Sequence, residues 1–554
     1  MKRFAIILLG FVLTFTTLRF LLNTTFFPIH DFTHVTRLVE MDRALNDGEF
    51  PVRWSKNLGY GYGMPLFNFY GPMPFYVAEV FHTVGLNYLF SIKAMVFVMT
   101  GVAFIGMYLL AAKYFGVLGG MVAATAFLLM PYRAVDLFVR GAFNELFAIS
   151  LVPFIMYGFI RISHEKSWFW TVLTSVFFMA FFTSHNLMTL MFFPFIYLFA
   201  LLQIYAKGVK KRSYCIRMHM AIALSVGLAA FYLFPSFFEK GWTQVDKLIG
   251  GYGAYAYHFL YIRQLFIENW GYGGSILGIE DGISFHLGWA HIILATTGVV
   301  AWSLRAKTWH QRILCWFLAV SLGVALFMTI FKSQFIWDRI PIFVYFQFPW
   351  RFLSIATVLV PLLAGAAVYA IPKSFPRKSI VFVATALLLI INFRFFQPQK
   401  LLDNPDDQYY NDPNRIQSQM SDILPDYIPI WMTKIQKPFQ RPFEILGNNS
   451  QQINVLIDRT QEKLLQFALA KPDTLLLRMA WFPDWTVYDN GIRIDHKVDD
   501  TTGFFSVQLG AGDHLISAKF EDTQLRTWTN IVSGMSAVIV IGVLGYAQHR
   551  RRSA

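Results

Sequence analysis

The residue types that could do chemistry are concentrated in the first long polar segment of the chain. It opens with His30-Asp31-Phe32-Thr33-His34, directly after an apolar stretch of the length that crosses membranes. A carboxylate at the edge of a bilayer can be partly desolvated there. Asp31 is therefore suited to act as a general base, or to ligate a metal ion that neutralises a phosphate. The alternative without chemistry is that Asp31 caps the N-terminus of a helix.

Two histidines flank this aspartate. On a helix, His30 and His34 would lie one turn apart, a spacing that allows both imidazoles to bind the same metal ion. A divalent metal ion is therefore the one cofactor for which the sequence offers candidate ligands. No complete ligand motif specifies it, and the sequence indicates no other cofactor.

Further along the same segment, Gly59-Tyr60-Gly61-Tyr62-Gly63 alternates glycine with aromatic residues. It is not a phosphate-binding P-loop, because the Lys-Ser/Thr pair of that motif is missing. A flexible backbone with interleaved rings fits either a turn over the membrane surface or a stacking surface for sugars, and we expect a turn. Tyr60, Tyr62 and the nearby Tyr70 are candidate substrate-binding residues.

A second group of ionisable residues lies in the connections between later apolar segments. Arg140 and Glu145 occupy one connection, His185 lies in the next on the same side, and Arg351 ends a third. Charge at membrane depth is costly, so such side chains usually face a cavity or one another. A guanidinium presents a bidentate fork to phosphate oxygens, which makes Arg140 and Arg351 candidates for binding a phosphate. The alternative is that they snorkel to lipid headgroups.

The elements that must position these residues are membrane helices. Of the 554 residues, 56% are hydrophobic and 14% are charged, whereas soluble domains carry about 25% charged residues. Apolar runs of about 20 residues recur along the chain, and in lipid such runs must form helices. We place about twelve spans near residues 4–22, 91–111, 116–130, 146–162, 168–183, 187–206, 218–237, 287–304, 312–331, 352–370, 379–393 and 528–546.

The distribution of charge predicts the orientation of these spans. The net charge of +14 comes from Lys and Arg residues clustered in short connections, such as residues 207–217 and 305–312. This pattern is typical of cytoplasmic loops and argues against nucleic-acid binding. Both termini are then cytoplasmic, provided that the short apolar segment 72–86 is an interfacial helix on the outer face. Cys215 and Cys315 lie on the inner half and are not expected to form a disulfide.

Three parts follow from this topology. Residues 1–396 form the transmembrane part, with the candidate catalytic loop at 23–90. Residues 397–526 form an extracytoplasmic β-rich domain, and residues 527–554 form the last span and a basic tail. The expected fold class is mainly α, a polytopic helical bundle with a small antiparallel β domain before the last span.

Turn residues predict the strand pairing in the β-rich part. Asp489-Asn490-Gly491 marks a hairpin turn, and apolar runs precede it at residues 464–470 and 474–480. Across Gly510-Ala511-Gly512, we expect residues 504–509 to pair with residues 514–520.

Taken together, these motifs resemble the bacterial membrane proteins labelled "6-pyruvoyl-tetrahydropterin synthase-related". The resemblance is carried by His30-Asp31, Pro51-Val52-Arg53-Trp54, Gly59–Pro65, Phe67–Tyr70, Pro131-Tyr132-Arg133 with Asp136, Arg140-Gly141 with Glu145, Ser184-His185-Asn186, Phe348-Pro349-Trp350-Arg351, Phe482-Pro483-Asp484-Trp485 and Gly510–His514. It implies no pterin chemistry, because nothing here resembles the His-rich site of the soluble zinc enzyme.

What the resemblance implies is the GT-C architecture of polyprenyl-phosphate-dependent glycosyltransferases. In that superfamily an acidic residue of the first outer loop acts on the acceptor, and Asp31 is the matching position. The second carboxylate that many members carry beside it is missing, since Phe32 and Thr33 follow. The implied reaction transfers a sugar from a polyprenyl-phosphate donor on the outer face of the bacterial cytoplasmic membrane.

In this reaction Asp31 would be the base, Arg140 and Arg351 would stabilise the leaving phosphate, and Glu145 or His185 would position substrate. Two other functions stay open, a transporter or flippase for lipid-linked glycans and a non-catalytic scaffold for cell-envelope assembly. Charges concentrated at outer helix ends rather than in mid-helix favour chemistry at that surface. The sugar, the acceptor and the oligomeric state are not predicted.

Overall fold

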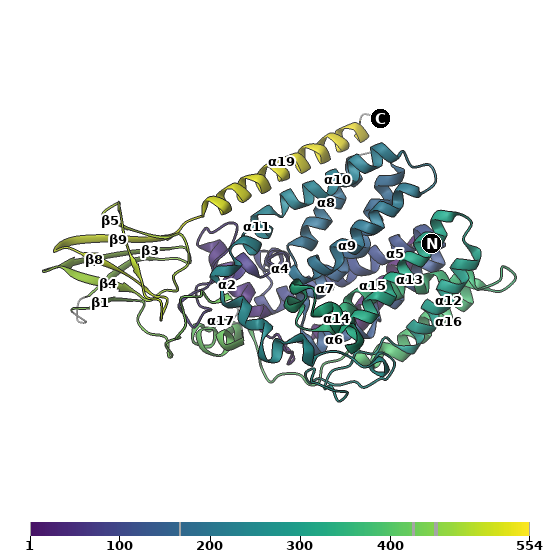
Figure 1. The fold of residues 1–554 in the computed structure, drawn as a ribbon, viewed down its shortest axis with the longest axis horizontal. Helices are drawn as coiled ribbons and strands as arrows, with labels where there is room; N and C mark the ends of the chain where they lie inside the picture. The colour runs from purple at the N-terminus through teal and green to yellow at the C-terminus, as the bar shows by residue number, and fades with distance from the viewer. Residues whose placement is uncertain (1, 166–167, 424–426, 448–451, 553–554) are drawn as a thin grey trace.

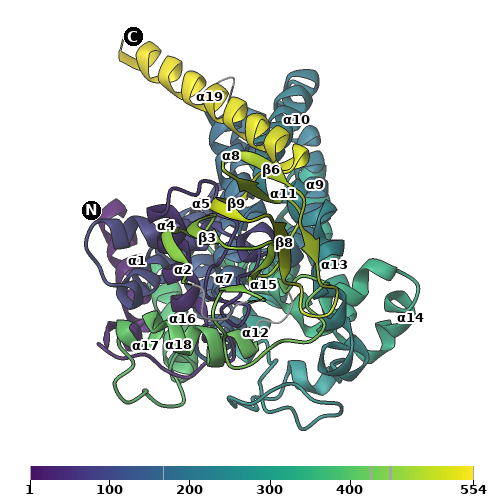
Figure 2. The same cartoon turned by 90° about the vertical axis from the view of Figure 1, so that its left-hand side faces the viewer.

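The computed structural model describes residues 2–165, 168–423, 427–447 and 452–552. Helices form the larger part of the molecule, and two β-sheets project from one end (Figure 1). The ends of the chain both lie at the opposite end of the helices (Figure 1). Figure 2 looks onto the β end and shows the last helix, α19, running outward from its start near α11. The predicted fold class, mainly α with a small antiparallel β domain, is confirmed.

Each of the twelve predicted spans falls on a helix. These helices are α1 (Lys2–Thr17), two halves of α5 (Tyr88–Leu128), α7 (Phe143–His164), α8 (Trp168–Phe182), α9 (Asn186–Leu202), α10 (Lys211–Leu228) continued by α11 (Ala230–Phe238), α12 (Trp289–Arg305), α13 (Trp309–Thr329), α15 (Leu353–Gly365), α16 (Arg377–Asn392) and α19 (Gln524–Arg552). Shorter helices lie between them: α2 (His34–Asn46), α3 (Leu66–Phe69), α4 (Met73–Thr83), α6 (Pro131–Val135), α14 (Gln334–Trp337), α17 (Asp407–Asn411) and α18 (Pro413–Arg415).

Fewer helices than twelve are long enough to cross a membrane unaided. Within the described residues, eight helical stretches have the length and hydropathy of a span, and one of them, Tyr88–Arg140, contains two predicted spans. The other three predicted spans lie on α1, α8 and α12, which have 16, 15 and 17 residues. The chain is therefore a multi-pass membrane protein. Several of its helices are shorter than the roughly 20 residues that a straight span requires.

The two halves of α5 fold back on each other at Gly116. This residue has φ +72° and ψ −177°, a backbone conformation that glycine adopts without strain. A Cβ added to Gly120 would lie 2.9 Å from both the Tyr108 ring and the Ala112 side chain. The second half therefore packs closely against the first, and small residues permit the approach.

The apolar segment 72–86 forms α4 and is too short to cross a membrane. Its 11 residues extend about 16 Å, roughly half of a bilayer core. The helix packs against α2 and α5. Its length agrees with the prediction that the segment is not a span, and its place relative to the lipid stays a prediction.

Two antiparallel sheets form the β part, with strand orders β1-β4-β8-β7 and β2-β3-β9-β5-β6. The predicted hairpin is confirmed, since β5 and β6 pair across Asn490 and Gly491, which have φ of +48° and +83°. The strands are β1 (Phe443–Ile445), β2 (Asn454–Asp458), β3 (Glu462–Leu469), β4 (Asp473–Leu477), β5 (Trp485–Asp489), β6 (Ile492–Ile494), β7 (Lys497–Val498), β8 (Phe505–Leu509) and β9 (Gly512–Phe520).

The predicted pairing of residues 504–509 with residues 514–520 is wrong. Strand β8 pairs with β4 and β7, whereas β9 pairs with β3 and β5 in the other sheet. The Phe505 ring of β8 lies 6.2 Å from the Trp485 ring of β5, so the two sheets contact each other through apolar side chains. A strand alternates buried and exposed residues in the same way whether it pairs with the preceding strand or joins the facing sheet. The sequence pattern therefore does not distinguish the two arrangements.

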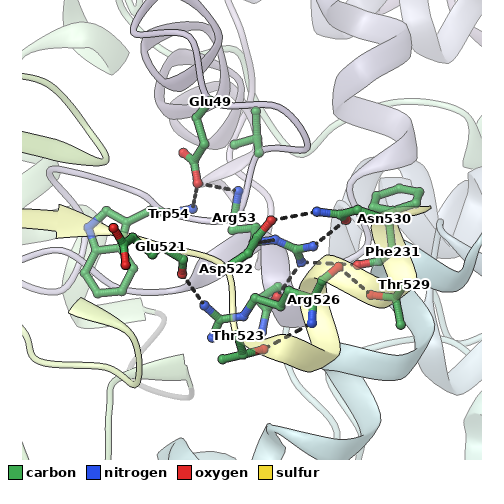
Figure 3. Close-up of polar contacts among 12 residues, drawn as sticks. Glu49, Arg53, Trp54, Phe231, Glu521, Asp522, Thr523, Arg526, Thr529 and Asn530 are labelled. Carbon is green, nitrogen blue, oxygen red and sulfur yellow. Dashed lines mark hydrogen bonds and ion pairs between the residues drawn. The ribbon is translucent and has the colours of Figure 1, made fainter. Parts of the chain in front are cut away.

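A polar network joins the first loop to the start of α19 (Figure 3). The Nε of Arg53 lies 3.2 Å from Asp522 Oδ1, and its Nη2 donates to Asn530 Oδ1 at 2.9 Å. Nearby, Arg526 Nε donates to Glu239 Oε2 at 3.0 Å, and both side chains are buried. Segments that are distant in sequence are thus held together where the β part meets the helices.

Candidate active site

A cavity of about 900 Å³ lies among the first loop, the N-terminal ends of α7 and α9, the end of α11 and the loops that follow it. Seven of the ten predicted site residues line it: His30, Asp31, Tyr70, Arg140, Glu145, His185 and Arg351. His34, Tyr60 and Tyr62 do not. Within the described part of the chain, residues as far apart in sequence as His30 and Arg351 thus line the same cavity.

Backbone hydrogen bonds hold Asp31 beside Arg140. The N–H of His30 donates to the carbonyl oxygen of Val139, and the N–H of Asp31 donates to that of Arg140, both at 3.0 Å. Gly141 makes this approach possible, because it has φ +66° and a Cβ there would lie 2.4 Å from the side chain of Ile29. The first loop is therefore fixed to the segment between α6 and α7.

The Asp31 carboxylate is held by Arg37 from the first turn of α2. Arg37 Nη1 donates to Oδ2 and Nη2 lies 3.0 Å from Oδ1, while Thr33 Oγ1 donates to Oδ1 at 2.9 Å. The side chain of Asp31 is 31% exposed, whereas that of Arg37 is 0% exposed. The N-cap of α2 is Thr33, with no side-chain cap bond. The interpretation of Asp31 as a helix cap is therefore wrong.

Asp31 is kept ionised by its surroundings. Burial alone would raise its pKa, but the charge of Arg37, with that of His34 and the hydrogen bonds from Arg37 and Thr33, holds the pKa of Asp31 below its usual range. The carboxylate is therefore a weak base at neutral pH. It remains a strong hydrogen-bond acceptor toward the cavity.

The two histidines do not lie one helical turn apart. Helix α2 begins only at His34, and His30 precedes it in non-helical backbone. His34 Nε2 lies 2.5 Å from the carbonyl oxygen of Gly141, and His30 Nε2 lies 3.2 Å from that of Tyr272. Within the described residues, no three His, Cys, Asp or Glu side chains form a group that could hold a metal ion. The spacing argument for a shared metal is therefore wrong.

Arg140 is already paired with carboxylates. Its Nη2 lies 2.9 Å from Glu145 Oε2, and its Nη1 forms an ion pair with Asp136. Its guanidinium lies 4.7 Å from the centre of the Trp350 ring. Glu145 is further held by a hydrogen bond from Ser354. A phosphate at Arg140 would thus compete with two carboxylates.

Arg351 and His185 retain unused hydrogen-bonding capacity. Arg351 Nη1 donates to the carbonyl oxygen of Phe346 at 2.8 Å and to Gln347 Oε1 at 3.2 Å. Its buried Nε has no hydrogen-bond partner among the described residues, and neither has Nδ1 of His185. Burial lowers the pKa of His185 to about 4, although Glu145 acts in the opposite direction, so the imidazole is neutral at pH 7. Both side chains can offer hydrogen bonds to a bound molecule.

Apolar side chains also line the cavity. They are Leu187, Leu190, Leu233, Phe237, Leu248, Ile249 and Ile342. Lys240 lines it as well, with its Nζ 3.3 Å from the hydroxyl of Tyr345, which in turn donates to Asp246 at 2.9 Å. The lining of the cavity thus combines charged and apolar side chains.

The Gly-Tyr stretch forms the expected turn, but its rings point elsewhere. Tyr60 has φ +62° and lies under Nζ of Lys437, 4.1 Å from the ring centre. The Tyr62 hydroxyl donates to the carbonyl oxygen of Gln436 at 2.9 Å, and its ring lies 4.7 Å from that of Phe504. Both tyrosines contact the segment before β1 and the β part, so their predicted role in substrate binding has no support from the cavity.

Sequence reasoning assigned no role to Arg37, which proves to be the partner of Asp31. The signal was present in principle: once Thr33 is taken as the N-cap, Arg37 lies in the first turn of the helix, close to the preceding loop. Tyr232 and Asn186, which bond each other at 2.8 Å beside the cavity, were also missed as a pair. Their contact joins α9 to α11, and no local sequence pattern indicates it.

No family model matches the sequence, and no curated protein matches it. Among solved structures, the fold is similar to the cryo-EM structure of the arabinofuranosyltransferase AftD from mycobacteria, with a TM-score of 0.46 and 14% identity over 76% of this chain and 29% of that one. It is also similar to the apo crystal structure of the Archaeoglobus fulgidus oligosaccharyltransferase, with a TM-score of 0.48 and 12% identity over 80% of this chain and 61% of that one. The chain therefore spans less than two thirds of either protein, and both are similarities of fold at low identity.

Proposed function

We propose that the chain is a GT-C-type membrane glycosyltransferase that moves a sugar from a polyprenyl-phosphate donor to an acceptor on the outer face of the bacterial cytoplasmic membrane. The observation that carries this proposal is the cavity, which is lined by a carboxylate, by a guanidinium whose Nε has no hydrogen-bond partner among the described residues, and by apolar side chains. A lipid-linked sugar consists of a sugar, a phosphate and a hydrocarbon chain, and these three kinds of lining residue suit its parts. The sequence resemblance described above supports the same reaction.

In the proposed reaction, the acceptor hydroxyl oxygen attacks the anomeric carbon as the bond from that carbon to the phosphate oxygen breaks. Polyprenyl phosphate leaves, and direct displacement inverts the configuration. Asp31 accepts a hydrogen bond from the hydroxyl and takes its proton late, when bond formation has made the attacking oxygen acidic. A carboxylate with a low pKa is adequate for such a late transfer, and the proton then passes to water.

The remaining residues bind and orient the substrates. Arg351 donates N–H groups to the phosphate, whose negative charge increases as it leaves. Arg140 fixes Glu145 beside the site, while neutral His185 hydrogen-bonds the sugar or the phosphate. His30 and Tyr70, which line the cavity on either side of Asp31, face the acceptor. The apolar lining residues hold the first units of the prenyl chain.

The test is to compare lipids and glycans in a deletion strain complemented with the wild type, Asp31→Asn or Asp403→Asn. Asp403 is an exposed aspartate outside the cavity and serves as the matched control. Loss of a general base slows a reaction by about 10²–10⁴-fold. We therefore expect Asp31→Asn to accumulate a polyprenyl-phosphate sugar and to lose one glycan, as the deletion does, with normal membrane expression.

Full restoration of the glycan by Asp31→Asn would remove this aspartate from the mechanism. A lipid-linked sugar trapped in the inner leaflet of the deletion strain would instead identify a flippase. An unchanged set of lipids and glycans in the deletion strain would exclude both functions.

A further inference from the structure

The chain supplies its own cation to the candidate catalytic carboxylate. Arg37 reaches both oxygens of Asp31, at 3.0 Å each. Thr33 donates to Oδ1 at 2.9 Å, and the hydroxyl of Tyr70 lies 3.4 Å from Oδ2. A carboxylate has about four lone-pair directions. Most of them are therefore already used, and the remaining exposure faces the cavity.

Arg37 is fixed in this position. Its side chain is fully buried, its guanidinium lies 4.0 Å from the centre of the Tyr70 ring, and its Nη1 donates to the Tyr70 hydroxyl at 2.8 Å. An arginine stays charged at every physiological pH. The position next to Asp31 that a metal ion would occupy thus holds a permanent positive charge.

The donor set around Asp31 does not fit a divalent metal ion. Magnesium and manganese prefer about six oxygen ligands, usually one or two carboxylates completed by waters and substrate phosphates. Among the described residues, the other carboxylate that lines the cavity is Glu145, which is held by Arg140, Tyr132 and Ser354. A divalent ion bound to Asp31 would also lie within a few ångströms of the Arg37 guanidinium and would be repelled by it.

We propose that Arg37 takes the place of a metal ion as the positioning residue of Asp31, and that sugar transfer needs no divalent metal. This inference rests on the proposed function. It accounts for the sequence around Asp31, where Phe32 and Thr33 stand in place of a second carboxylate. An arginine that contacts both oxygens of one carboxylate holds it in place without a second carboxylate.

The first test measures metal binding without any substrate. Purified wild-type protein and Asp31→Asn in detergent are titrated with Mn²⁺, and free Mn²⁺ is followed by electron paramagnetic resonance. We expect the two isotherms to coincide. A stoichiometric site present in the wild type and lost in Asp31→Asn would overturn the inference. This readout does not depend on the identity of the donor or on transfer activity.

The second test measures transfer in membranes from the complemented strain, before and after treatment with EDTA. We expect the rate to be unchanged. A loss that Mn²⁺ or Mg²⁺ restores would overturn the inference while leaving the proposed glycosyltransferase intact. Absence of transfer under every condition would contradict the proposed function instead, and the Mn²⁺ titration would still decide the question of the metal.

The third test compares Arg37→Gln and Arg37→Lys with the control Arg43→Gln. Arg43 lies on the same helix but bonds Glu40 and Asn411, outside the cavity. Loss of positioning should lower kcat by about 10²-fold in Arg37→Gln and leave the donor KM within a few-fold, because the base rather than the binding site is affected. Arg37→Lys should recover part of the rate.

A pH profile separates positioning from a structural role. The positive charge of Arg37 keeps the pKa of Asp31 low, so its removal should move the acid limb of kcat to higher pH. His34, Tyr70 and His185 also face Asp31, but they are present in all the variants compared. An acid limb in Arg37→Gln identical to that in Arg43→Gln would overturn the inference. If Arg37→Gln does not fold, the profile of Arg37→Lys and the Mn²⁺ titration decide it.

Discussion

The two arginines of the cavity differ in what already binds them. Arg140 faces the carboxylates of Asp136 and Glu145, so its charge is balanced within the protein. Arg351 bonds only a backbone carbonyl and the amide of Gln347, and none of the described carboxylates lies within 4.0 Å of it. The uncompensated guanidinium is the one expected to hold an anionic substrate, while the compensated one shapes the site.

Substitution of Arg351 tests this difference. A hydrogen bond to a charged group contributes about 1.5–3 kcal/mol, which corresponds to about a 10- to 100-fold change in affinity. We expect Arg351→Gln to raise the donor KM by about that factor, as measured in membranes with increasing donor. Arg339→Gln, at an exposed arginine outside the cavity, is the control. A donor KM that stays at the wild-type value in Arg351→Gln would assign phosphate binding to another residue.

At the scale of elements, the end of α11 and the start of α19 are joined by a buried ion pair. Glu239 and Arg526 have side chains that are 2% and 0% exposed, and Thr523 adds a hydrogen bond to Glu239 at 3.0 Å. Arg526 lies next to the network around Arg53 (Figure 3). These contacts fix the direction in which the chain leaves the β part for its last helix.

Removing one partner of this pair should be costly. Arg526→Met leaves the Glu239 carboxylate buried without its ion pair, and such changes destabilise proteins by about 3–5 kcal/mol. Thermal unfolding of the purified protein in detergent measures the loss. Adding Glu239→Met to Arg526→Met should recover part of it, because the unpaired charge is removed.

An exposed ion pair provides the comparison. Lys437 and Asp422 are 50% and 59% exposed, so Asp422→Asn should change the stability by no more than about 0.5 kcal/mol. Equal losses in Asp422→Asn and Arg526→Met would mean that burial does not set the strength of the contact between α11 and α19.

At the scale of the whole molecule, both ends of the chain lie at the end of the helices away from the β-sheets (Figure 1). Clusters of Lys and Arg lie in short connections between the helices. By the positive-inside rule, we expect these connections and both ends of the chain to be cytoplasmic. The cavity and the β-sheets would then share the outer face. Cys215 and Cys315 are both free cysteines, so a cysteine-free background requires the loss of no disulfide.

Cysteine labelling tests this orientation. In a background with both native cysteines replaced by serine, Lys471→Cys lies between β3 and β4, and Lys307→Cys lies between α12 and α13, both at exposed positions. A membrane-impermeant thiol reagent should label Lys471→Cys in spheroplasts and should label Lys307→Cys only after permeabilisation. The reverse pattern would place the cavity in the cytoplasm and would remove the basis for a lipid-linked donor on the outer face.

Features set by consecutive residues could be predicted without the structure. Each predicted span falls on a helix, because hydropathy over about 20 residues is a local property. The β5–β6 hairpin follows from Asn490-Gly491 for the same reason. The meeting of Asp31 with Arg351 at one cavity was within reach as well, since ionisable residues at the same ends of membrane helices must find one another or water.

Features that depend on distant contacts could not be predicted. The start of α2 at His34 separates His30 from the helix, and the partners of Tyr62 lie more than 370 residues away in the chain. Strands β8 and β9 belong to different sheets, although their sequences suit a hairpin equally well. In each case the choice is made by packing between segments that no local pattern relates.

The division between sequence and tertiary structure is clearest for the charged residues of the cavity. Hydropathy and charge along the chain are sufficient to place Asp31, Arg140 and Arg351 at helix ends of the same side. The sequence cannot tell that Arg140 is already neutralised or that Arg351 is not. Ion pairs and hydrogen bonds act over about 3 Å, and only the folded chain brings residues to that distance.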